Sequence, residues 1–255
     1  MILNVEDCSM CFGGLTAVSE LQLEVLPQEL VGVIGPNGAG KTTFFNIVTG
    51  VYTPTSGKVF FDNQCISVLA PFEICRLGIA RTFQNIRLFP SMTVLETIKV
   101  AMISKLQGGF WSSIWRGKHY IAEEARVDRA ARHLLDVMGL SAEHNQMAVS
   151  LPYGKQRRLE LARALATEPK ILLLDEPAAG MNRLEKSELM RMILTIKAQF
   201  KVSIVLIEHD MKVVMGVCER IVVLDHGVKI ADGTPEAVRN NPDVIDAYLG
   251  GHDEP

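Results

Sequence analysis

The chain has 255 residues, 48% of them hydrophobic, and its 26 basic and 29 acidic residues leave a net charge of −3. This composition is ordinary for a folded domain, and the charge balance excludes a binder of nucleic acid or anionic lipid that works by bulk electrostatics. No apolar stretch reaches the roughly 18 residues of a membrane-spanning helix. The start, MILNVEDCSMCF, lacks the regions of a signal peptide. We therefore expect the chain to stay in the cytosol.

The predicted elements alternate between strand and helix over most of the chain. A turn and a buried strand over 25–35 lead into a helix over 41–49, and another strand covers 57–62. Apolar strands at 171–175, 202–208, 221–225 and 228–231 alternate with helices at 186–200 and 211–217. This pattern is typical of a mostly parallel sheet covered by helices, and therefore of an α/β fold.

Between about residues 89 and 139 the pattern changes to helix alone. A helix over 92–102 has Thr93 as its expected N-cap, and a clearly amphipathic helix covers 123–138. We interpret this stretch as a helical insert between strand-rich segments. The final residues, GGHDEP, are expected to form a frayed tail.

The five cysteines include one C-x-x-C, formed by Cys8 and Cys11. This spacing fits a metal or redox pair, and it also fits two small residues of an early strand and turn. A zinc site needs a second Cys or His pair at suitable spacing, and the sequence has none. We favour the structural interpretation.

Residues 35–42, GPNGAGKT, match the phosphate-binding pattern G-x-x-x-x-G-K-[ST] between an apolar strand and a helix. Glycines let the backbone wrap around phosphates, and the helix N-terminus favours their negative charge. Lys41 is expected to neutralise β- and γ-phosphate oxygens, and the Thr42 hydroxyl to bind Mg²⁺. The predicted ATP-binding residues here are Gly35, Pro36, Asn37, Gly38, Ala39, Gly40, Lys41, Thr42 and Thr43.

Two carboxylates end the apolar strand ILLLDEP. In a parallel sheet the carboxyl ends of the strands open onto the ligand crevice. Asp175 is suited to hold Mg²⁺ through its water shell, and Glu176 to orient and deprotonate an attacking water. A solvated strand-end turn is the alternative interpretation, and the nearby phosphate loop disfavours it.

With these motifs, the chain resembles the ABC transporter ATPases nearly from end to end. Thr82-Phe83-Gln84 is similar to the family's Q-loop, and the resemblance implies that Gln84 completes the Mg²⁺ and water shell and senses the membrane subunit. Ile207-Glu208-His209-Asp210 resembles the switch-histidine loop, which implies that His209 contacts the γ-phosphate beside Glu176. Phe12 stands where the family stacks an aromatic ring on adenine, although a core phenylalanine is the alternative.

The signature segment departs from the family pattern L-S-G-G-Q, which faces the nucleotide of the partner subunit. Here it consists of Leu151, Pro152, Tyr153, Gly154 and Lys155. Pro152 removes a hydroxyl and an N–H donor but is tolerated at a helix start, and Lys155 adds a positive charge able to reach the phosphate. We expect a working but weakened contact and slow basal hydrolysis. Asn182 also stands where the family usually has aspartate in the D-loop.

The resemblance implies a P-loop NTPase fold with a mostly parallel core, an N-terminal antiparallel β region and an inserted helical subdomain. Residues 1–84 and 165–255 are expected to form the core with its C-terminal extension, and 85–164 the helical subdomain. Within the family, strings such as RTFQNIRLF and PAAGMN resemble the ATPase subunits of branched-chain amino acid importers. ATPases of urea or amide importers and of lipopolysaccharide exporters share much of this pattern.

The family's mode of action implies the partners. Two ATPase subunits, identical or not, would enclose ATP and Mg²⁺ at shared sites, beneath transmembrane permease subunits at the cytoplasmic face of the inner or plasma membrane. A substrate-binding protein would take part indirectly, and nucleic acid would not. Phe110, Trp111 and Trp115 form a permease-docking patch if exposed, and pack the helical insert if buried; we favour burial.

Two alternative functions belong to other classes of protein. A soluble ABC-type ATPase acting on nucleic acid or ribosomes commonly has tandem units or long coiled-coil inserts, which this chain lacks. A plain P-loop kinase or GTPase is disfavoured by Gln84, the signature segment and His209, and the guanine-reading N-K-x-D is missing.

Overall fold

The computed structural model describes residues 1–103 and 118–249. The chain divides into two compact units, Met1–Gln84 with Lys170–Pro255 and Asn85–Pro169. The helical unit ends at Pro169, five residues beyond the predicted end at residue 164. The difference arises because the turn that ends the last helix of this unit continues past residue 164. Its backbone bonds join Ala166 to Ala162 (2.8 Å) and Glu168 to Leu165 (2.8 Å).

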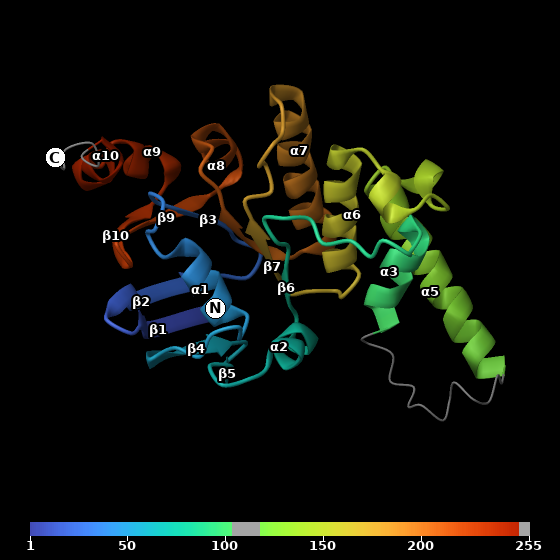
Figure 1. Ribbon diagram of the computed structural model, residues 1–255, viewed down its shortest axis with the longest axis horizontal. Coiled ribbons are helices and arrows are strands. Elements are labelled where there is room, and N and C mark those ends of the chain that lie inside the picture. Colours follow the sequence, from blue (N-terminus) through green and yellow to red (C-terminus); the bar gives the residue numbers. More distant parts are fainter. Residues whose placement is uncertain (104–117, 250–255) are drawn as a thin grey trace. The chain divides into compact units, whose positions relative to one another are not determined.

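A six-stranded sheet forms the centre of the first unit. Its strands are β3 (Leu30–Ile34), β6 (Ile79–Arg81), β7 (Ile171–Asp175), β8 (Ser203–Ile207), β9 (Arg220–Asp225) and β10 (Val228–Gly233). Their order is β10-β9-β3-β8-β7-β6, and only the β9–β10 pair is antiparallel (Figure 1). Every residue of β3, β7 and β8 is buried, as expected for parallel strands covered on both faces. The predicted α/β fold class is confirmed.

A second, antiparallel sheet belongs to the same unit. It contains β1 (Leu3–Phe12), β2 (Leu15–Val25), β4 (Ser56–Phe61) and the short β5 (Gln64–Cys65), in the order β2-β1-β4-β5. The N-terminal antiparallel region implied by the family resemblance is therefore present. Cys8 and Cys11 both lie in β1, and Cys8 is buried whereas Cys11 is exposed.

The main core fills the space between the two sheets. Alternate residues of the central strands point into it, among them Val33, Leu173 and Val205, and meet Leu3 and Phe61 of the antiparallel sheet. Helix α1 (Lys41–Val48) contributes Phe44 and Phe45 to this core. Burial of so many aliphatic and aromatic side chains holds the strand ends, and the loops that follow them, in fixed positions.

The remaining helices of this unit are α2 (Pro71–Leu77), α7 (Arg183–Phe200), α8 (Met211–Val217), α9 (Pro235–Arg239) and α10 (Pro242–Leu249). Helix α8 packs tightly on the other face of β3. A Cβ added at Gly32 would lie 2.9 Å from the sulfur of Cys218 and 3.1 Å from Val214. Only glycine therefore allows this helix to approach the strand so closely.

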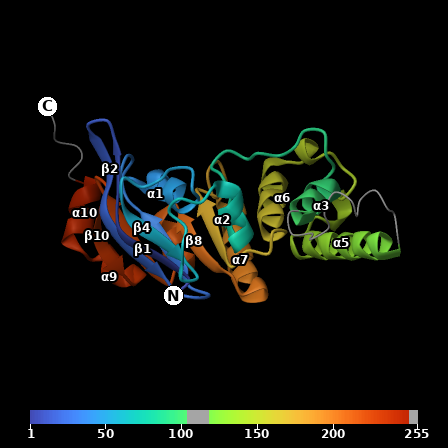
Figure 2. The same ribbon diagram turned by 90° about the horizontal axis from the view of Figure 1, so that it is seen from below.

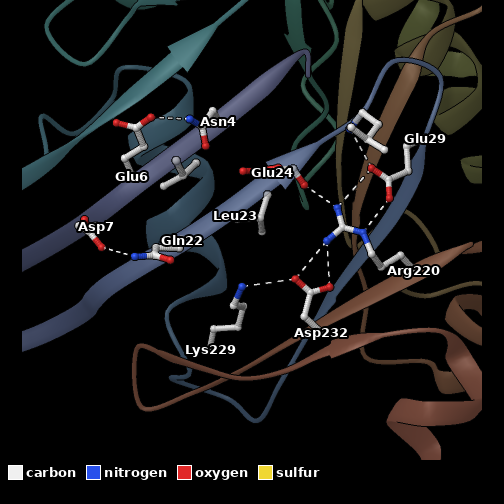
Figure 3. A pocket seen from close by; sticks show the side chains of 12 residues that line it. Asn4, Glu6, Asp7, Gln22, Leu23, Glu24, Glu29, Arg220, Lys229 and Asp232 are labelled. Carbon is white, nitrogen blue, oxygen red and sulfur yellow. Dashed lines mark hydrogen bonds and ion pairs between the residues drawn. The ribbon is translucent and has the colours of Figure 1, made fainter.

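Arg220 joins the two sheets through a set of charged bonds (Figure 3). Its guanidinium donates to Glu29 (Nε to Oε1, 2.7 Å), to Asp232 (Nη1 to Oδ1, 2.9 Å) and to the carbonyl of Glu24. Arg220 and Asp232 belong to the central sheet, whereas Glu24 belongs to β2. The charges of Arg220, Glu29 and Asp232 are therefore paired with one another, and Arg220 connects the two sheets.

The second unit is helical. It contains α3 (Val94–Ile103), α5 (Lys118–Val137) and α6 (Tyr153–Leu165), which lie side by side (Figures 1 and 2), with short 3₁₀ turns at Ser141–Glu143 and Ala148–Ser150. Thr93 caps α3 as predicted: its hydroxyl accepts the Glu96 N–H (3.2 Å), and the Glu96 carboxylate accepts the Thr93 N–H (2.8 Å). Phe110, Trp111, Trp115 and the expected frayed tail lie outside the described residues.

Arg157 and Glu160 form a buried ion pair in α6 (2.6 Å), with both side chains 1% exposed. Arg157 is therefore buried and is not part of a basic surface. Nowhere in residues 1–103 and 118–249 is a helix long and apolar enough to cross a membrane.

Candidate nucleotide site

The candidate site lies at the carboxyl ends of four neighbouring strands. In the order β3, β8, β7, β6, each strand leads directly into a predicted functional segment: the phosphate loop, His209, the Asp175–Glu176 pair and Gln84. Parallel strands bring these ends to one edge of the sheet. Segments more than 160 residues apart in the sequence are thereby placed next to one another.

The phosphate loop depends on glycine at two positions. Gly35 has φ 150°, and a Cβ there would lie 2.0 Å from the Leu224 carbonyl oxygen; Gly40 has φ 96°, and its Cβ would lie 2.4 Å from the Ala17 carbonyl oxygen. Gly40 is the N-cap of α1 and provides no side-chain cap for the first amides of that helix. Uncapped amides at a helix start are suited to bind an anion such as a phosphate.

Lys41 folds back onto this loop. Its Nζ donates to the carbonyl oxygens of Gly35 and Pro36, each at 2.7 Å. Burial lowers the pKa of Lys41 below its usual value, while the nearby carboxylates of Glu176 and Asp175 oppose that shift. The ammonium thus lies between the loop and the acidic pair. Among the other predicted loop residues, Asn37, Gly38 and Thr42 are exposed, Ala39 is buried, and Gly40 and Thr43 are half-buried.

Glu176 is the meeting point of the predicted catalytic residues. Gln84 Nε2 donates to Glu176 Oε2 (2.7 Å), and His209 Nδ1 lies 3.7 Å from the same oxygen. The Glu176 backbone has φ 45°, an uncommon conformation for a residue other than glycine. The Glu176 side chain is 22% exposed and that of His209 62% exposed, so both are accessible to a substrate.

Asp175 is held by a residue that the sequence patterns did not single out. Arg81 Nη2 donates to Asp175 Oδ2 (2.7 Å), and both side chains are 7% exposed. Arg81 Nη1 also donates to Asn46 Oδ1 of α1 (2.7 Å), and the guanidinium lies over the rings of Phe45 and Phe83. Arg81 therefore connects the acidic pair to the helix that follows the phosphate loop.

The sequence feature that could have indicated a role for Arg81 is its position as a basic residue at the end of β6. Because β6 pairs with β7 in parallel, with Arg81 opposite Leu173, the Arg81 side chain starts near the strand end that carries Asp175. The pairing of these two strands is a property of the fold and not of any motif.

Oxygen donors at this edge fit a magnesium ion in chemical type. Mg²⁺ prefers oxygen ligands and keeps several waters, so a hydroxyl, a carboxylate and substrate phosphates are enough to hold it. The Thr42 hydroxyl is exposed, and Asp175 Oδ1 is the oxygen that does not pair with Arg81. Among the described residues no group of three or more His, Cys, Asp or Glu side chains is placed to hold a metal ion alone. The nucleotide would therefore have to supply ligands.

Phe12 lies at the end of β1 with 41% of its surface exposed, and it packs edge-on against Tyr52 with ring centroids 5.2 Å apart. It is therefore not a core phenylalanine. An exposed ring supported by a second ring is suited to stack on a flat base.

The signature segment begins helix α6 in the helical unit. Leu151 is buried, Pro152 is the N-cap residue, and the carbonyl of Pro152 accepts the N–H of Lys155 (2.9 Å). Lys155 Nζ forms an ion pair with Glu143 (2.6 Å). The Lys155 ammonium would have to break this ion pair to bind a phosphate. Tyr153 is 44% exposed and Gly154 half-buried.

Asn182 has a clear structural role. It is the N-cap of α7, where its Oδ1 accepts the N–H groups of Leu184 (2.9 Å) and Glu185 (3.0 Å). Asparagine and aspartate cap helices about equally well. The departure from the family's aspartate therefore leaves the start of α7 intact.

The C-terminal helix α10 reaches the phosphate loop. Residues of α10, including Asp243 and Asp246, line a hollow together with Pro36 and Asn37. Burial raises the pKa of Tyr248 above its usual value, and a hydrogen bond with the backbone of Gly35 opposes the rise. The conformation of the loop is thus connected to the end of the described chain.

Two family models match this sequence. The model described as ABC transporter matches residues 18–179, which include the phosphate loop, Gln84, the signature segment and the acidic pair. The chain belongs to the ABC transporter family. A second model, described as branched-chain amino acid ATP-binding cassette transporter, matches residues 228–254 and therefore covers α10.

Curated relatives match over nearly their whole length. The high-affinity branched-chain amino acid transport ATP-binding protein LivG of Escherichia coli strain K12 is 48% identical, over 98% of each chain. The lipopolysaccharide export system ATP-binding protein LptB of Haemophilus influenzae is 32% identical, over 98% of this chain and 97% of that protein. This ABC ATPase is therefore much more similar to the first than to the second.

Solved structures of ATP-binding cassettes share the fold. The ADP conformation of the cassette MJ1267 superposes with a TM-score of 0.84 at 31% identity, covering 98% of both chains. The cassette MJ0796, in a dimeric post-hydrolysis state bound to ADP and Pi, superposes with a TM-score of 0.76 at 25% identity, covering 92% of this chain and 99% of that one. The chain is an ABC ATPase with the architecture of these cassettes.

Replacing Arg81 by Met should destabilise the protein. The change leaves the buried Asp175 carboxylate without its ion-pair partner, which we expect to lower the free energy of unfolding by about 3 kcal/mol. Urea unfolding followed by circular dichroism measures this. The double variant Arg81→Met/Asp175→Asn removes the unpaired charge and should regain most of the loss. A single variant as stable as the unchanged chain would contradict the assigned ion pair.

Proposed function

We propose that this ABC ATPase energises a branched-chain amino acid importer, and that Glu176, Gln84 and His209 carry out ATP hydrolysis. The observation that carries the catalytic part is the contact of Gln84 and His209 with one carboxylate oxygen of Glu176, beside the phosphate loop. The cargo is inferred from the 48% identity with a branched-chain amino acid transport protein. The match of the C-terminal segment to a family model described by the same cargo supports it.

In the proposed reaction, the amides of residues 38–43 and the Lys41 ammonium bind the phosphates of ATP, and Phe12 stacks on adenine. Thr42, Asp175 and Gln84 would hold Mg²⁺, which would supply positive charge to neutralise the phosphates. Glu176 orients a water and takes its proton, and Gln84 fixes the direction of the carboxylate. As water attacks the γ-phosphorus and the bond to the oxygen of the departing ADP breaks, His209 contacts the γ-phosphate beside Glu176 and stabilises charge on the transferred phosphoryl group.

The proposed assembly contains two ATPase subunits, identical or different. The segment Leu151–Lys155 of each subunit would bind the γ-phosphate at the other subunit's site, so that ATP favours the closed pair. We propose that this pair lies beneath transmembrane permease subunits at the cytoplasmic face of the inner or plasma membrane, as a peripheral component. A substrate-binding protein would deliver the cargo on the opposite side.

Glu176→Gln should bind ATP, accumulate as a closed dimer and lose nearly all turnover. The amide keeps the shape of the side chain but cannot accept the proton of the attacking water. Size-exclusion chromatography with ATP and a phosphate-release assay measure the two effects, and we expect hydrolysis to fall by at least about 100-fold. Lys41→Ala is the control: without its phosphate-binding cation it should form no ATP-trapped dimer. Full turnover in Glu176→Gln would remove Glu176 from this role.

Pro152→Ser should increase basal hydrolysis. Serine adds the hydroxyl donor of the family pattern, and one preorganised donor contributes up to roughly 3 kcal/mol to transition-state stabilisation. We expect a gain of about tenfold, measured as steady-state phosphate release by the full-length chain. Pro152→Ala separates the hydroxyl from the loss of the proline ring. Equal rates for the serine and alanine variants would mean that the hydroxyl has no part in hydrolysis.

Affinity purification tests the proposed partners. A chain tagged at its N-terminus, extracted from host membranes in mild detergent, should copurify with two hydrophobic permease subunits and a second ATPase. Mass spectrometry identifies them, and leucine uptake into cells that lack the chain should be restored by the unchanged protein and not by Lys41→Ala. Lipid-export components would instead favour an exporter, and soluble or ribosomal partners alone would contradict the transport role.

A further inference from the structure

Glu208, which comes directly before His209, is a buried carboxylate without a role in the proposed reaction. It follows the last residue of β8, is 1% exposed, and its side chain is fully enclosed. A buried carboxylate is costly unless hydrogen bonds compensate its charge. Its partners therefore indicate what it does.

The partners of Glu208 are backbone amides of two site segments. Oε1 accepts the N–H of Ala178 at 2.6 Å, and Oε2 accepts the N–H of His209 at 3.2 Å. Burial raises the pKa of Glu208, and bonds from the amides of Ala178, Asp210 and His209 oppose that rise. One carboxylate thus binds both the turn after Glu176 and the loop that carries His209.

A second connection joins the same two segments. Lys186, near the start of α7, forms an ion pair with Asp210 (2.7 Å), and Asp210 caps helix α8 by accepting the N–H of Lys212 (2.9 Å). Both neighbours of His209 are therefore attached to the stretch that follows Glu176, Glu208 through Ala178 and Asp210 through Lys186. The inner bond is buried, whereas the outer pair is partly exposed.

The Glu176 backbone needs such support. Its left-handed conformation is strained for a residue other than glycine and persists only where the surroundings hold it. On one side, the Glu176 N–H donates to the Ile207 carbonyl (2.9 Å), and two residues later Ala178 is held by Glu208. The turn is thus attached at both ends to residues 207 and 208, which directly precede His209.

We propose that Glu208 is a positioning residue for ATP hydrolysis, which sets the separation of Glu176 and His209 by binding the amides of Ala178 and His209 with one carboxylate. The proposal rests on the roles proposed above for Glu176 and His209. Loss of this carboxylate frees two buried amides and lets the two site segments move independently. The phosphate loop makes none of these bonds, so nucleotide binding, which depends mainly on that loop, should change much less than kcat.

Glu208→Gln and Glu208→Ala test this in the full-length chain. The glutamine keeps one acceptor oxygen and the size of the side chain, and we expect kcat to fall about tenfold; alanine removes both acceptors, and we expect about 100-fold. KM for ATP and the affinity for a fluorescent ATP analogue should stay within about twofold. In the nucleotide-free protein, hydrogen exchange should be faster in peptides covering 177–182 and 208–211, with α1 unchanged.

Glu219→Gln is the matched control. Glu219 also accepts a backbone N–H, that of Leu30 (3.2 Å), and pairs with a lysine, Lys197, but it contacts neither site segment. It should leave kcat and the exchange of both segments unchanged. Lys186→Met, which breaks only the outer pair, should lower kcat less than Glu208→Gln does.

Two results would overturn the proposal. One is an unchanged kcat in Glu208→Gln and Glu208→Ala. The other is an equal fall in kcat and nucleotide affinity, with faster exchange throughout the first unit, which would show a general structural role. Failure of the catalytic proposal is distinguishable: Glu176→Gln would then hydrolyse ATP normally, while faster exchange in the Glu208 variants would still report the loss of the connection.

Discussion

Four neighbouring strands end at one edge of the central sheet, and the order in which they hydrogen-bond determines the site. The phosphate loop, the His209 loop, the acidic pair and Gln84 follow β3, β8, β7 and β6 in that spatial order. These segments are far apart in the sequence, and only the pairing of the strands makes them neighbours. Their arrangement is fixed by a core of fully buried aliphatic residues on both faces of the sheet, whose burial makes a shift in strand register very unfavourable.

At this edge, the charges of Lys41, Arg81, Asp175 and Glu208 are compensated by protein groups: an ion pair for Arg81 and Asp175, and backbone groups for Lys41 and Glu208. Lys41 binds loop carbonyls near the acidic pair, Arg81 neutralises Asp175, and backbone amides surround Glu208. Each of these groups is mostly buried, where an unpaired charge would be expensive. The site is therefore already organised before a substrate enters, which reduces the reorganisation that hydrolysis requires.

Much of the fold and part of the site could be predicted from the sequence. Apolar strands such as ILLLD and VLI indicated the parallel sheet, and the glycine spacing of the phosphate loop indicated a turn that the structure shows to have left-handed φ at Gly40. Glu176 was singled out by its place at the end of an apolar strand, and Gln84 and His209 by resemblance; the structure brings the three together. Their catalytic roles remain predictions.

Arg81 and Glu208 could not be found in the same way. Arg81 is 94 residues from Asp175, and only the pairing of β6 with β7 makes them neighbours. Glu208 is the last residue of a predicted strand, and nothing in the sequence indicates that its carboxylate binds the amide of Ala178, 30 residues away. Similarly, Lys155 reads as a free positive charge, but the fold of the helical unit places Glu143 against it. Which residues become neighbours here is determined by long-range strand pairing and burial, and local sequence patterns do not reveal it.

The position of helix α10 beside the phosphate loop has a consequence for how this site can be altered. Gly35 and Gly40 of the phosphate loop cannot be replaced without steric conflict with backbone carbonyls. The C-terminal helix has no such restriction. Substitutions at Asp243 or Asp246 change the surface that lies beside Pro36 and Asn37, while the phosphate-binding motif itself stays unchanged.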